Sequence, residues 1–556
     1  MTTAAARVVV PGDMPDWASI LATNQGLWDG SLGKAAAGGE PVLIATNVGG
    51  HGPVGVMESM LAVALTLRGA QVSTLLCDGV LPGCLKAEHA DLPDPVVLVE
   101  RKLGDRLCKG CIWRGEAMVK PLGTGHETIS ANLSDAERAM ARQIAESVPL
   151  AEIDQFEFEG LAVGEQAKAG TLRYFARGDL STEPHGEAVL RRYLEASMLS
   201  VFATRNVIRK HGFTVAVFHH GLYVPQGLVG EVCRQMGVRV VNWFVSYRKN
   251  TFIFSHHDTY HHTLMTEPTE SWEDMAWSDE HRNQIVSYLK SRWYGSRDWI
   301  SFHEKPDDVD REFKEFSDSV GLDLSRPVVG LLTNVVWDAQ LHYPANAFPN
   351  MIAWVISSIH EFAKRPHLQL LIRVHPAEIR GTSKSRQPIL EEIRKIFPTL
   401  PDNVFVIPPE SAVSTYRAME HCDSVIIYGT KTGVELTSMG IPTIVAGEAW
   451  IRGKGLTRDA SSIADYCSIL DSLPVGQRMD AEQVDRARRY AYHFFFRRMM
   501  PMPFMVPNGK GSLFSVTVSR LDDLLPGRYH GLDLACDGIL SGSAVVYPAE
   551  VQGVPD

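Results

Sequence analysis

Short apolar runs alternate with longer helix-like stretches along the first half of the chain. The apolar run at residues 41–46 has the length of a buried strand, and residues 56–67 repeat apolar side chains with the period of a helix. Residues 125–210 look mainly helical. Three further runs are typical of strands: residues 71–76, 213–218 and 238–244. This alternation predicts a parallel sheet covered by helices on both faces.

The second half repeats the pattern after a charged stretch, residues 306–323, that suits a linker or an interdomain helix. Its predicted strands are residues 328–333, 368–374, 404–407, 424–428 and 443–446, and its predicted helices are residues 351–363, 389–396, 414–421 and 433–439. Two such blocks predict an α/β fold with two doubly wound, Rossmann-like domains that face each other across a cleft.

The pattern divides the chain into five parts. They are a weakly periodic lead-in (1–40), an N-terminal Rossmann-like domain with a helical insertion and a cysteine cluster (41–320), a C-terminal domain (321–480), a return helix (481–510) and a C-terminal extension (511–556). The two domains each contain enough chain to bury a core of their own.

The charge balance narrows the range of functions. The 556 residues include 54 Lys and Arg against 65 Asp and Glu, which gives a net charge of −11. Binding to nucleic acid is therefore not expected, because it needs net or clustered positive charge. The sequence contains no run of 18 apolar residues, so no membrane-spanning helix is predicted. The first residues lack the pattern of a secretory signal. We expect a cytoplasmic protein with reduced cysteines.

The loop after the first strand, residues 50–55, has the spacing G-x-G-x-x-G. Asp78 follows the next strand, where an acidic residue would bind the ribose of a dinucleotide. One interpretation is therefore an NAD-dependent oxidoreductase or epimerase that uses Gly50, Gly55 and Asp78. A second is a loop whose N–H groups contact an acceptor or a phosphate, and a third is a tight turn without chemistry.

Three loops of the second block follow strands, so they gather at the sheet edge where open α/β sheets bind ligands. The first carries a His-Pro pair, the second is rich in hydroxyl groups and opens a helix, and the third is basic and rich in glycine. Such loops suit the phosphates and ribose of a nucleotide. The candidate donor-binding residues are Arg373, His375, Pro376, Glu378, Thr430, Lys431, Thr432, Gly433, Glu435 and Lys454.

Four features, in order, resemble the capsule polysaccharide biosynthesis family: the pair His375-Pro376, the hydroxyl-rich loop, residues 440–447 and residues 455–457. That family includes transferases of 3-deoxy-manno-octulosonic acid (Kdo) and has the GT-B glycosyltransferase fold. The resemblance extends over about residues 325–500.

The resemblance implies a glycosyltransferase that moves a sugar, Kdo or a related acid, from a CMP-sugar onto a surface polysaccharide or glycolipid. The C-terminal domain would bind the nucleotide-sugar donor, and the N-terminal domain the glycan acceptor. By resemblance, nucleotide binding falls to His375, Pro376, Thr430, Thr432 and Glu435. Members need no metal for the transfer, because helix dipoles and basic side chains stabilise the departing phosphate.

Residues 486–498 mix aromatic and basic side chains. We interpret them as the helix that crosses back onto the N-terminal domain in GT-B proteins. The alternative is peripheral association with the inner face of the cytoplasmic membrane. Outside the enzymes, the alternative function is a carbohydrate-assembly protein that keeps the fold without turnover, and the oligomeric state stays open.

Histidines are concentrated in two segments of the N-terminal domain. His219 and His220 follow a predicted strand, and four more histidines lie within residues 256–262. An imidazole there could act as general base for an acceptor hydroxyl, hold a leaving phosphate or ligate a metal. We expect His220 first, and His51 second, to be catalytic because both follow predicted strands. Histidines without chemistry are the alternative.

Four cysteines are crowded into a short part of the N-terminal domain: Cys77, Cys84, Cys108 and Cys111. The C-x2-C pair with a second pair nearby fits a tetrahedral thiolate site, so we expect structural zinc. An iron–sulfur cluster and unligated thiols are the alternatives. A metal bound by Cys77 would leave the adjacent Asp78 less able to bind a ribose.

Overall fold

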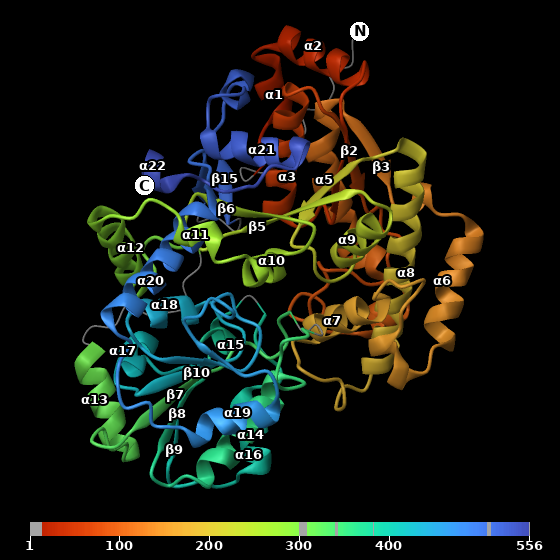
Figure 1. Ribbon diagram of the computed structural model, residues 1–556. Coiled ribbons are helices and arrows are strands. Elements are labelled where there is room, and N and C mark those ends of the chain that lie inside the picture. The colour runs from red at the N-terminus through yellow and green to blue at the C-terminus, as the bar shows by residue number, and fades with distance from the viewer. Residues whose placement is uncertain (1–13, 300–308, 340–342, 382, 509–512, 555–556) are drawn as a thin grey trace.

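The computed structural model describes residues 14–299, 309–339, 343–381, 383–508 and 513–554 (Figure 1). Their strands form two main sheets, in the orders β13-β6-β5-β4-β1-β2-β3 and β12-β11-β10-β7-β8-β9. Counted from the first strand of each domain, both contain the order 3-2-1-4-5 that defines doubly wound sheets. The prediction of two Rossmann-like α/β domains is confirmed.

The N-terminal sheet is parallel from β3 to β5 and antiparallel at its other edge. Its strands are β1 (Pro41–Asn47), β2 (Gln71–Leu76), β3 (Gly125–Thr128), β4 (Val215–His219), β5 (Arg239–Val245), β6 (Thr251–His256) and β13 (Met499–Pro501). The helices before β6 are α1 (Trp17–Ala22), α2 (Gln25–Ala36), α3 (Gly52–Leu67), α4 (Val96–Val99), α5 (Lys109–Val119), α6 (Asp135–Ser147), α7 (Val163–Phe175), α8 (Gly186–His211) and α9 (Gln226–Gln235).

Three helices connect the N-terminal sheet to the C-terminal domain: α10 (Tyr260–Thr266), α11 (Glu270–Glu273) and α12 (Asp279–Arg292). The parallel C-terminal sheet contains β7 (Val328–Leu332), β8 (Gln369–Arg373), β9 (Val404–Ile407), β10 (Ser424–Ile427), β11 (Thr443–Val445) and β12 (Arg458–Asp459). Its helices are α13 (Val309–Val320), α14 (Met351–Ala363), α15 (Ala377–Arg380), α16 (Ile389–Ile396), α17 (Thr415–Glu420), α18 (Thr432–Ser438) and α19 (Ile463–Asp471).

After the C-terminal sheet, the chain returns to the N-terminal domain. Helix α20 (Ala481–Tyr492) packs against α18 and α12. A π-helical turn (His493–Arg497) follows, and β13 then pairs with β6 (Figure 1). The remaining elements are the hairpin β14 (Met505–Pro507) and β15 (Phe514–Val516) and the helices α21 (His530–Ser541) and α22 (Ala549–Gln552). Within the described part of the chain, no helix is long and apolar enough to cross a bilayer.

The predicted lead-in, in which the sequence shows little periodicity, contains the helices α1 and α2 within residues 17–36. Asp16 and Asn24 cap these helices, and Trp17 and Trp28 are buried. The Trp17 indole donates a hydrogen bond to Ser59 Oγ (2.9 Å), on α3. α1 has only six residues and α2 contains three glycines, so a periodicity analysis does not detect them. Residues 1–13 of the predicted lead-in lie outside the described residues.

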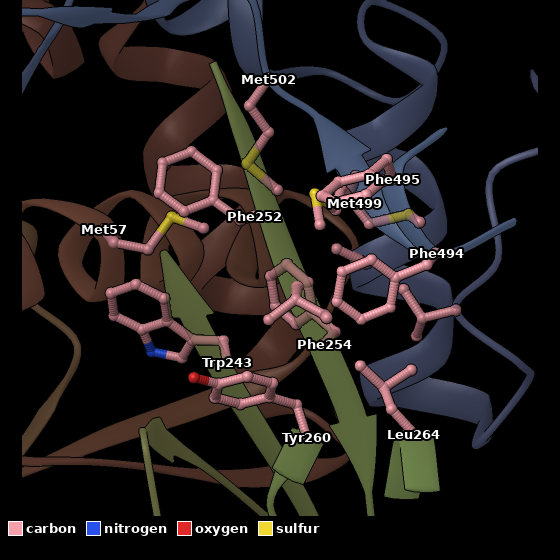
Figure 2. Packing of buried hydrophobic residues seen from close by; sticks show 14 of the residues in the cluster. Met57, Trp243, Phe252, Phe254, Tyr260, Leu264, Phe494, Phe495, Met499 and Met502 are labelled. Carbon is pink, nitrogen blue, oxygen red and sulfur yellow. The ribbon is translucent and has the colours of Figure 1, made fainter. Parts of the chain in front are cut away.

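The returning chain completes the largest apolar core. Figure 2 shows the Phe494 ring of the returning chain beside Phe254 of β6. The Phe494 ring is fully buried and meets the Phe495 ring edge to face, with centroids 4.8 Å apart. The pairing of β13 with β6 was not predicted because the two strands are about 250 residues apart in the chain (β13 at 499–501 against β6 at 251–256).

A carboxyl group is buried inside the N-terminal domain. Glu58 lies on α3 and accepts a hydrogen bond from Trp243 Nε1 of β5 (2.9 Å). Burial raises the pKa of Glu58 to about 7, and hydrogen bonds, including one from the His219 backbone, only partly oppose that shift.

We expect Phe494→Ala to lower the free energy of unfolding by about 3–5 kcal/mol, the cost of a cavity left by a buried phenyl ring. Denaturant unfolding followed by fluorescence measures the change. The matched control is Tyr294→Ala, because this ring is half exposed. A Phe494→Ala variant as stable as the control would contradict the packing described for the return segment.

The buried carboxyl makes stability depend on pH with a defined sign. The folded-state pKa of about 7 exceeds the usual 4.5, so stability from Glu58 is complete below pH 4.5 and lost as the pH rises through about 7. The loss is about 3 kcal/mol at 1.36 kcal/mol per pKa unit. We expect Glu58→Gln to remove this loss, measured as the unfolding free energies at pH 5 and pH 7.5. The control Glu152→Gln changes an exposed carboxyl, and equal pH slopes for all three proteins would contradict the assignment.

Candidate functional site

The two doubly wound sheets contact each other through loops that follow their strands. The Tyr223 hydroxyl, after β4, donates to Asp338 Oδ1 (2.9 Å) and accepts from the Ala339 amide (2.8 Å), both after β7. Trp450, after β11, stacks on His261, with ring centroids 5.6 Å apart. Ligands of doubly wound sheets bind outside the carboxyl ends of the strands, where the strand order reverses. We call this region the interdomain junction.

The N-terminal side of the interdomain junction carries a chain of imidazoles, the histidine cluster: His51, His219, His220 and His261. Ring centroids are 5.3 Å apart for His51 and His219, 5.5 Å for His219 and His220, and 5.9 Å for His220 and His261. The structure therefore brings together both histidines predicted to be catalytic. The roles of His219 and His261 were missed, although both belong to the two histidine-rich segments.

Backbone geometry sets where these rings point. His51 caps α3, immediately after the loop that follows β1. His220 has a left-handed backbone (φ 66°) at the end of β4, and its ring stacks on Phe244 at 4.6 Å. His261 lies in the first turn of α10. The other histidines of the 256–262 segment do not join the cluster through ring contacts: His256 Nε2 lies 2.8 Å from the Ser543 carbonyl oxygen.

The histidine cluster is neutral at physiological pH. Burial, followed by the charge of Arg173, lowers the pKa of His51 to about 4. Burial and the neighbouring imidazoles hold the pKa values of His219 and His220 well below their ordinary value, and burial lowers that of His261 to about 3. A neutral imidazole keeps a lone pair that accepts a proton.

Several ring nitrogens of the cluster lack a hydrogen-bond partner among the described residues. They are His51 Nδ1, His219 Nδ1 and His261 Nε2, all buried. Unpaired buried polar atoms are costly and are usually satisfied by water or a ligand. Across the junction, Asn334 Oδ1 is unpaired in the same way. Unpaired polar atoms thus lie on both sides of the junction.

The C-terminal side of the interdomain junction contains His375 and the hydroxyl-rich loop. The His375 amide donates to Thr333 Oγ1 (3.0 Å), and His375 Nδ1 accepts from the Ala377 amide (3.0 Å). A neutral ring in this state carries its proton on Nε2, which makes Nε2 the donor. Pro376 is buried and begins α15, so the loop has a fixed backbone.

Thr430 and Thr432 follow β10 in the neighbouring loop. Their hydroxyl oxygens are 3.1 Å apart, and the Thr432 amide donates to Thr430 Oγ1 (3.3 Å). Asn334 Nδ2, after β7, donates to the Gly429 carbonyl (2.7 Å) and so ties the two loops together. The structure therefore places three loops, after β7, β8 and β10, at one sheet edge.

Four predicted donor-binding residues are engaged in other contacts. The Arg373 guanidinium donates to the backbone carbonyls of Pro408 and Ser411. Glu378 Oε1 accepts from the Ile389 amide (3.1 Å), and burial raises the pKa of Glu378 to about 7.

The other two are Gly433 and Lys454. A Cβ atom on Gly433 would lie 2.6 Å from Ile427 Cδ1, so glycine is needed for packing. Lys454 Nζ donates to the carbonyls of Met265 (2.9 Å) and Glu267. Burial lowers the pKa of Lys454 to about 8. The side chains of Arg373 and Lys454 therefore bind backbone carbonyls, and Glu378 uses one of its two oxygens on the Ile389 amide.

Lys431 and Glu435 belong to a buried ion network. Glu435 Oε1 lies 3.1 Å from Lys431 Nζ and 3.2 Å from Arg292 Nε, and its other oxygen accepts from the Tyr416 hydroxyl. Burial would raise the pKa of Glu435, but Arg292 and Lys431 outweigh it and hold the value at about 2. The Glu435 carboxylate, predicted to bind the donor nucleotide, is therefore paired with two cations. Arg292, on α12, lies 143 residues before Glu435 (435 − 292), and no sequence signal connects them.

The loop with the dinucleotide spacing is covered by α5. A Cβ atom on Gly49 would lie 2.5 Å from the Gly115 Cα, and one on Gly50 would lie 2.9 Å from the Cys111 Cβ. Asp78 accepts hydrogen bonds from the amide (3.2 Å) and the hydroxyl of Ser130. The glycines allow α5 to pack closely, and the Asp78 carboxylate binds a turn, so both features have a structural use here.

The four clustered cysteines lie around the same helix. Cys84 and Cys108 are buried, and Cys77 and Cys111 are half-buried free thiols. Among the described residues, no three His, Cys, Asp or Glu side chains are grouped closely enough to hold a metal ion. The arrangement therefore gives no support to the predicted zinc site.

Residues 318–468 match the family described as "Capsule polysaccharide biosynthesis protein". No curated protein matches the chain. Among solved structures, KpsC of Thermosulfurimonas dismutans, titled a beta Kdo 2,4 transferase, shares 14% identity over 56% of this chain and 88% of that chain, with a TM-score of 0.34. UDP-GlcNAc 2-epimerase from Neisseria meningitidis shares 10% identity over 81% of this chain and 98% of that chain, with a TM-score of 0.27. A glycosyltransferase from Rickettsia africae shares 9% identity over 91% of this chain and 100% of that chain, with a TM-score of 0.26. The segment that carries His375, Thr430 and Glu435 thus matches the capsule polysaccharide biosynthesis family, as its residues predicted.

Proposed function

We propose that this protein is a glycosyltransferase of the GT-B type that moves a sugar from a nucleotide-sugar donor to a glycan or glycolipid acceptor. The observation that carries the proposal is the set of unpaired, buried imidazole nitrogens opposite the loops of the segment that matches the capsule family. The donor lies on the C-terminal side of the interdomain junction and the acceptor on the N-terminal side.

The donor nucleotide is bound by His375, Thr430 and Thr432. The Nε2 proton of His375 and two threonine hydroxyls present donors at one sheet edge, which suits the oxygens of a phosphate. These contacts strengthen when the glycosidic bond breaks and negative charge grows on the leaving phosphate. Transfer by this route uses fixed hydrogen-bond donors and no metal ion.

The acceptor hydroxyl is activated by the histidine cluster. His220 takes the proton as the hydroxyl oxygen attacks the anomeric carbon. The His219 ring contacts both His220 and His51 and so links the two predicted bases. Low pKa values keep these rings unprotonated, so each lone pair is available, although the same shift makes each ring a weaker base than an ordinary imidazole.

An acidic sugar such as Kdo, carried as a CMP-sugar, is the favoured donor. Arg173 lies close enough to lower the pKa of both His51 and His220. Its guanidinium is paired with Glu88 (2.7 Å) and lies over the Tyr223 ring, 5.5 Å from the ring centroid, so it is fixed beside the cluster. Because this guanidinium is already used by Glu88 and the Leu85 carbonyl, the acidic sugar rests on the match to the capsule family and not on a cation free to bind it.

The NAD-dependent alternative has little in its favour because α5 covers the Gly50 loop and Ser130 occupies Asp78. Two measurements distinguish a transferase from a carbohydrate-assembly protein that has no turnover. Thermal-shift measurements with NAD, CMP, UDP, GDP and CDP identify the nucleotide, and hydrolysis of the corresponding nucleotide sugar measures turnover. Stabilisation by NAD alone, or nucleotide binding without turnover, would contradict the proposal.

We expect His375→Ala to weaken binding of the stabilising nucleotide by about 1–3 kcal/mol, the usual cost of losing a hydrogen bond to a charged group. Calorimetry on the folded variant measures the affinity. The control His367→Ala changes an exposed histidine just before β8, at the opposite end of the strand that precedes His375. Equal affinity for both variants would remove His375 from the donor site.

We expect His220→Asn to reduce the transfer rate by about 10²–10⁴-fold, the usual contribution of a general base. Asparagine tolerates the left-handed backbone of this position, so the loop keeps its conformation. Nucleotide affinity should stay unchanged, because the ring lies on the acceptor side. His185→Asn, an exposed histidine, is the control. A variant with full turnover would show that another group takes the proton.

A further inference from the structure

The segment between β8 and α16, which we call the β8 loop, is attached to the N-terminal domain. It carries His375 at its start. The Arg386 amide donates to the Ala176 carbonyl (2.9 Å), and Gln387 Oε1 accepts from the Gly178 amide (2.9 Å). Ala176 and Gly178 follow α7, and Gln387 is buried. A loop that carries a candidate donor-binding residue is therefore bound to the other domain by backbone hydrogen bonds.

Glu88, on the segment after β2, contributes a side chain to the same attachment. Its Oε2 accepts from the Ser383 hydroxyl of the β8 loop (2.8 Å), and its Oε1 lies 2.7 Å from Arg173 Nη2 of α7. Ser383 is buried, and the side chains of Glu88 and Arg173 are only 14% and 18% exposed. The two oxygens of one carboxylate therefore each bind a side chain from a different domain.

The Glu88 carboxyl group is ionised at physiological pH. Burial would raise its pKa, but Arg173 and the Ser383 hydroxyl outweigh burial and hold the pKa below its ordinary value. A hydrogen bond to an ionised acceptor is about twice as strong as one between neutral groups. The contact between Ser383 and Glu88 is therefore stronger than an ordinary hydroxyl contact.

Arg173 is itself fixed, so it limits the freedom of Glu88. Arg173 Nη1 donates to the Leu85 carbonyl (3.1 Å), and the guanidinium lies over the Tyr223 ring, 5.5 Å from its centroid. Together with burial, the charge of Arg173 lowers pKa values in the histidine cluster. Glu88 and Arg173 therefore connect Ser383 to the surroundings of the histidine cluster.

Glu378 connects the two ends of the β8 loop. Its side chain accepts from the Ile389 amide (3.1 Å), and its carbonyl accepts from the Ser385 amide (2.8 Å). Its own amide donates to the His375 carbonyl (3.1 Å). His375 is therefore tied to the part of the loop that binds Glu88.

We propose that Glu88 is a positioning residue that holds the β8 loop, and His375 with it, in a fixed place relative to the histidine cluster. It acts through Ser383 and Arg173 and touches neither the nucleotide nor the acceptor. Its importance for catalysis rests on the proposed function, because transfer needs the donor and the base in a defined geometry. The attachment of the loop is a property of the fold and is tested separately.

The test compares two serines of the β8 loop in the full chain. Ser383→Ala removes the hydroxyl that donates to Glu88. The matched control is Ser385→Ala, because the Ser385 hydroxyl donates within the loop, to the Gln387 carbonyl (3.3 Å). Glu88→Gln removes the charge from the other partner. If this variant does not fold because Arg173 has lost its counterion, Ser383→Ala still decides.

Hydrogen exchange followed by mass spectrometry measures the attachment, because the Arg386 and Gly178 amides donate across the two domains. In peptides that contain these amides, we expect Ser383→Ala to speed exchange about tenfold or more, the factor for losing one hydrogen bond to a charged group. Ser385→Ala should leave the exchange at the parent rate.

Transfer kinetics measure the positioning. We expect Ser383→Ala to lower kcat about tenfold while the affinity for the stabilising nucleotide changes by less than about twofold. The affinity is kept because the contacts of His375 with Thr333 and Ala377 lie within the C-terminal domain. A loop that is merely damaged would lose affinity as well. Ser385→Ala should keep both values.

Three outcomes would overturn the proposal. One is unchanged exchange in Ser383→Ala. Another is faster exchange with unchanged kcat, and the third is an equal loss of kcat and nucleotide affinity. A parent protein that transfers no sugar would contradict the proposed function instead, and the exchange rates would still decide whether Glu88 holds the loop.

Discussion

A buried ion network, Arg292 with Glu435 and Lys431, is one of the interactions that hold the two domains together. Arg292 ends a helix that extends from the N-terminal sheet, and the other two residues begin α18 of the C-terminal sheet. Arg292 also pairs with Asp298 (2.7 Å), so no charge in the group is left without a counterpart. Removing one member of such a network leaves an uncompensated buried charge, which costs about 3–5 kcal/mol. The network therefore ties α12, which precedes the C-terminal domain in the chain, to the start of α18.

The contrast between the two sides of the interdomain junction has a common physical cause, which is burial. On the N-terminal side, burial acts on imidazoles that have no acidic partner, and they stay neutral. On the C-terminal side it acts on a carboxylate with two cations, and Glu435 stays charged. One side is thereby suited to accept a proton, and the other is rigid.

Local sequence patterns were sufficient for most of the fold and for part of the site. Apolar runs located the parallel strands, and the rule that ligands bind at strand ends located His51, His220, His375 and Thr430. The pattern failed where a partner lies far away in the chain. Lys454 was predicted to bind a phosphate, but its ammonium donates to a backbone carbonyl of α10. The pairing of β13 with β6 and the two indoles of α1 and α2 are long-range contacts of the same kind.

The position of β13 has a consequence for how the protein is made. Strand β6 is an interior strand only because β13, which follows the whole C-terminal domain in the chain, covers its open side. During synthesis, the ribosome must therefore release the entire C-terminal domain before the N-terminal sheet can close. Until then β6 presents unpaired backbone groups, the feature by which sheets join to other chains and aggregate. A C-terminal domain that folds quickly and independently would shorten the time for which that edge is open.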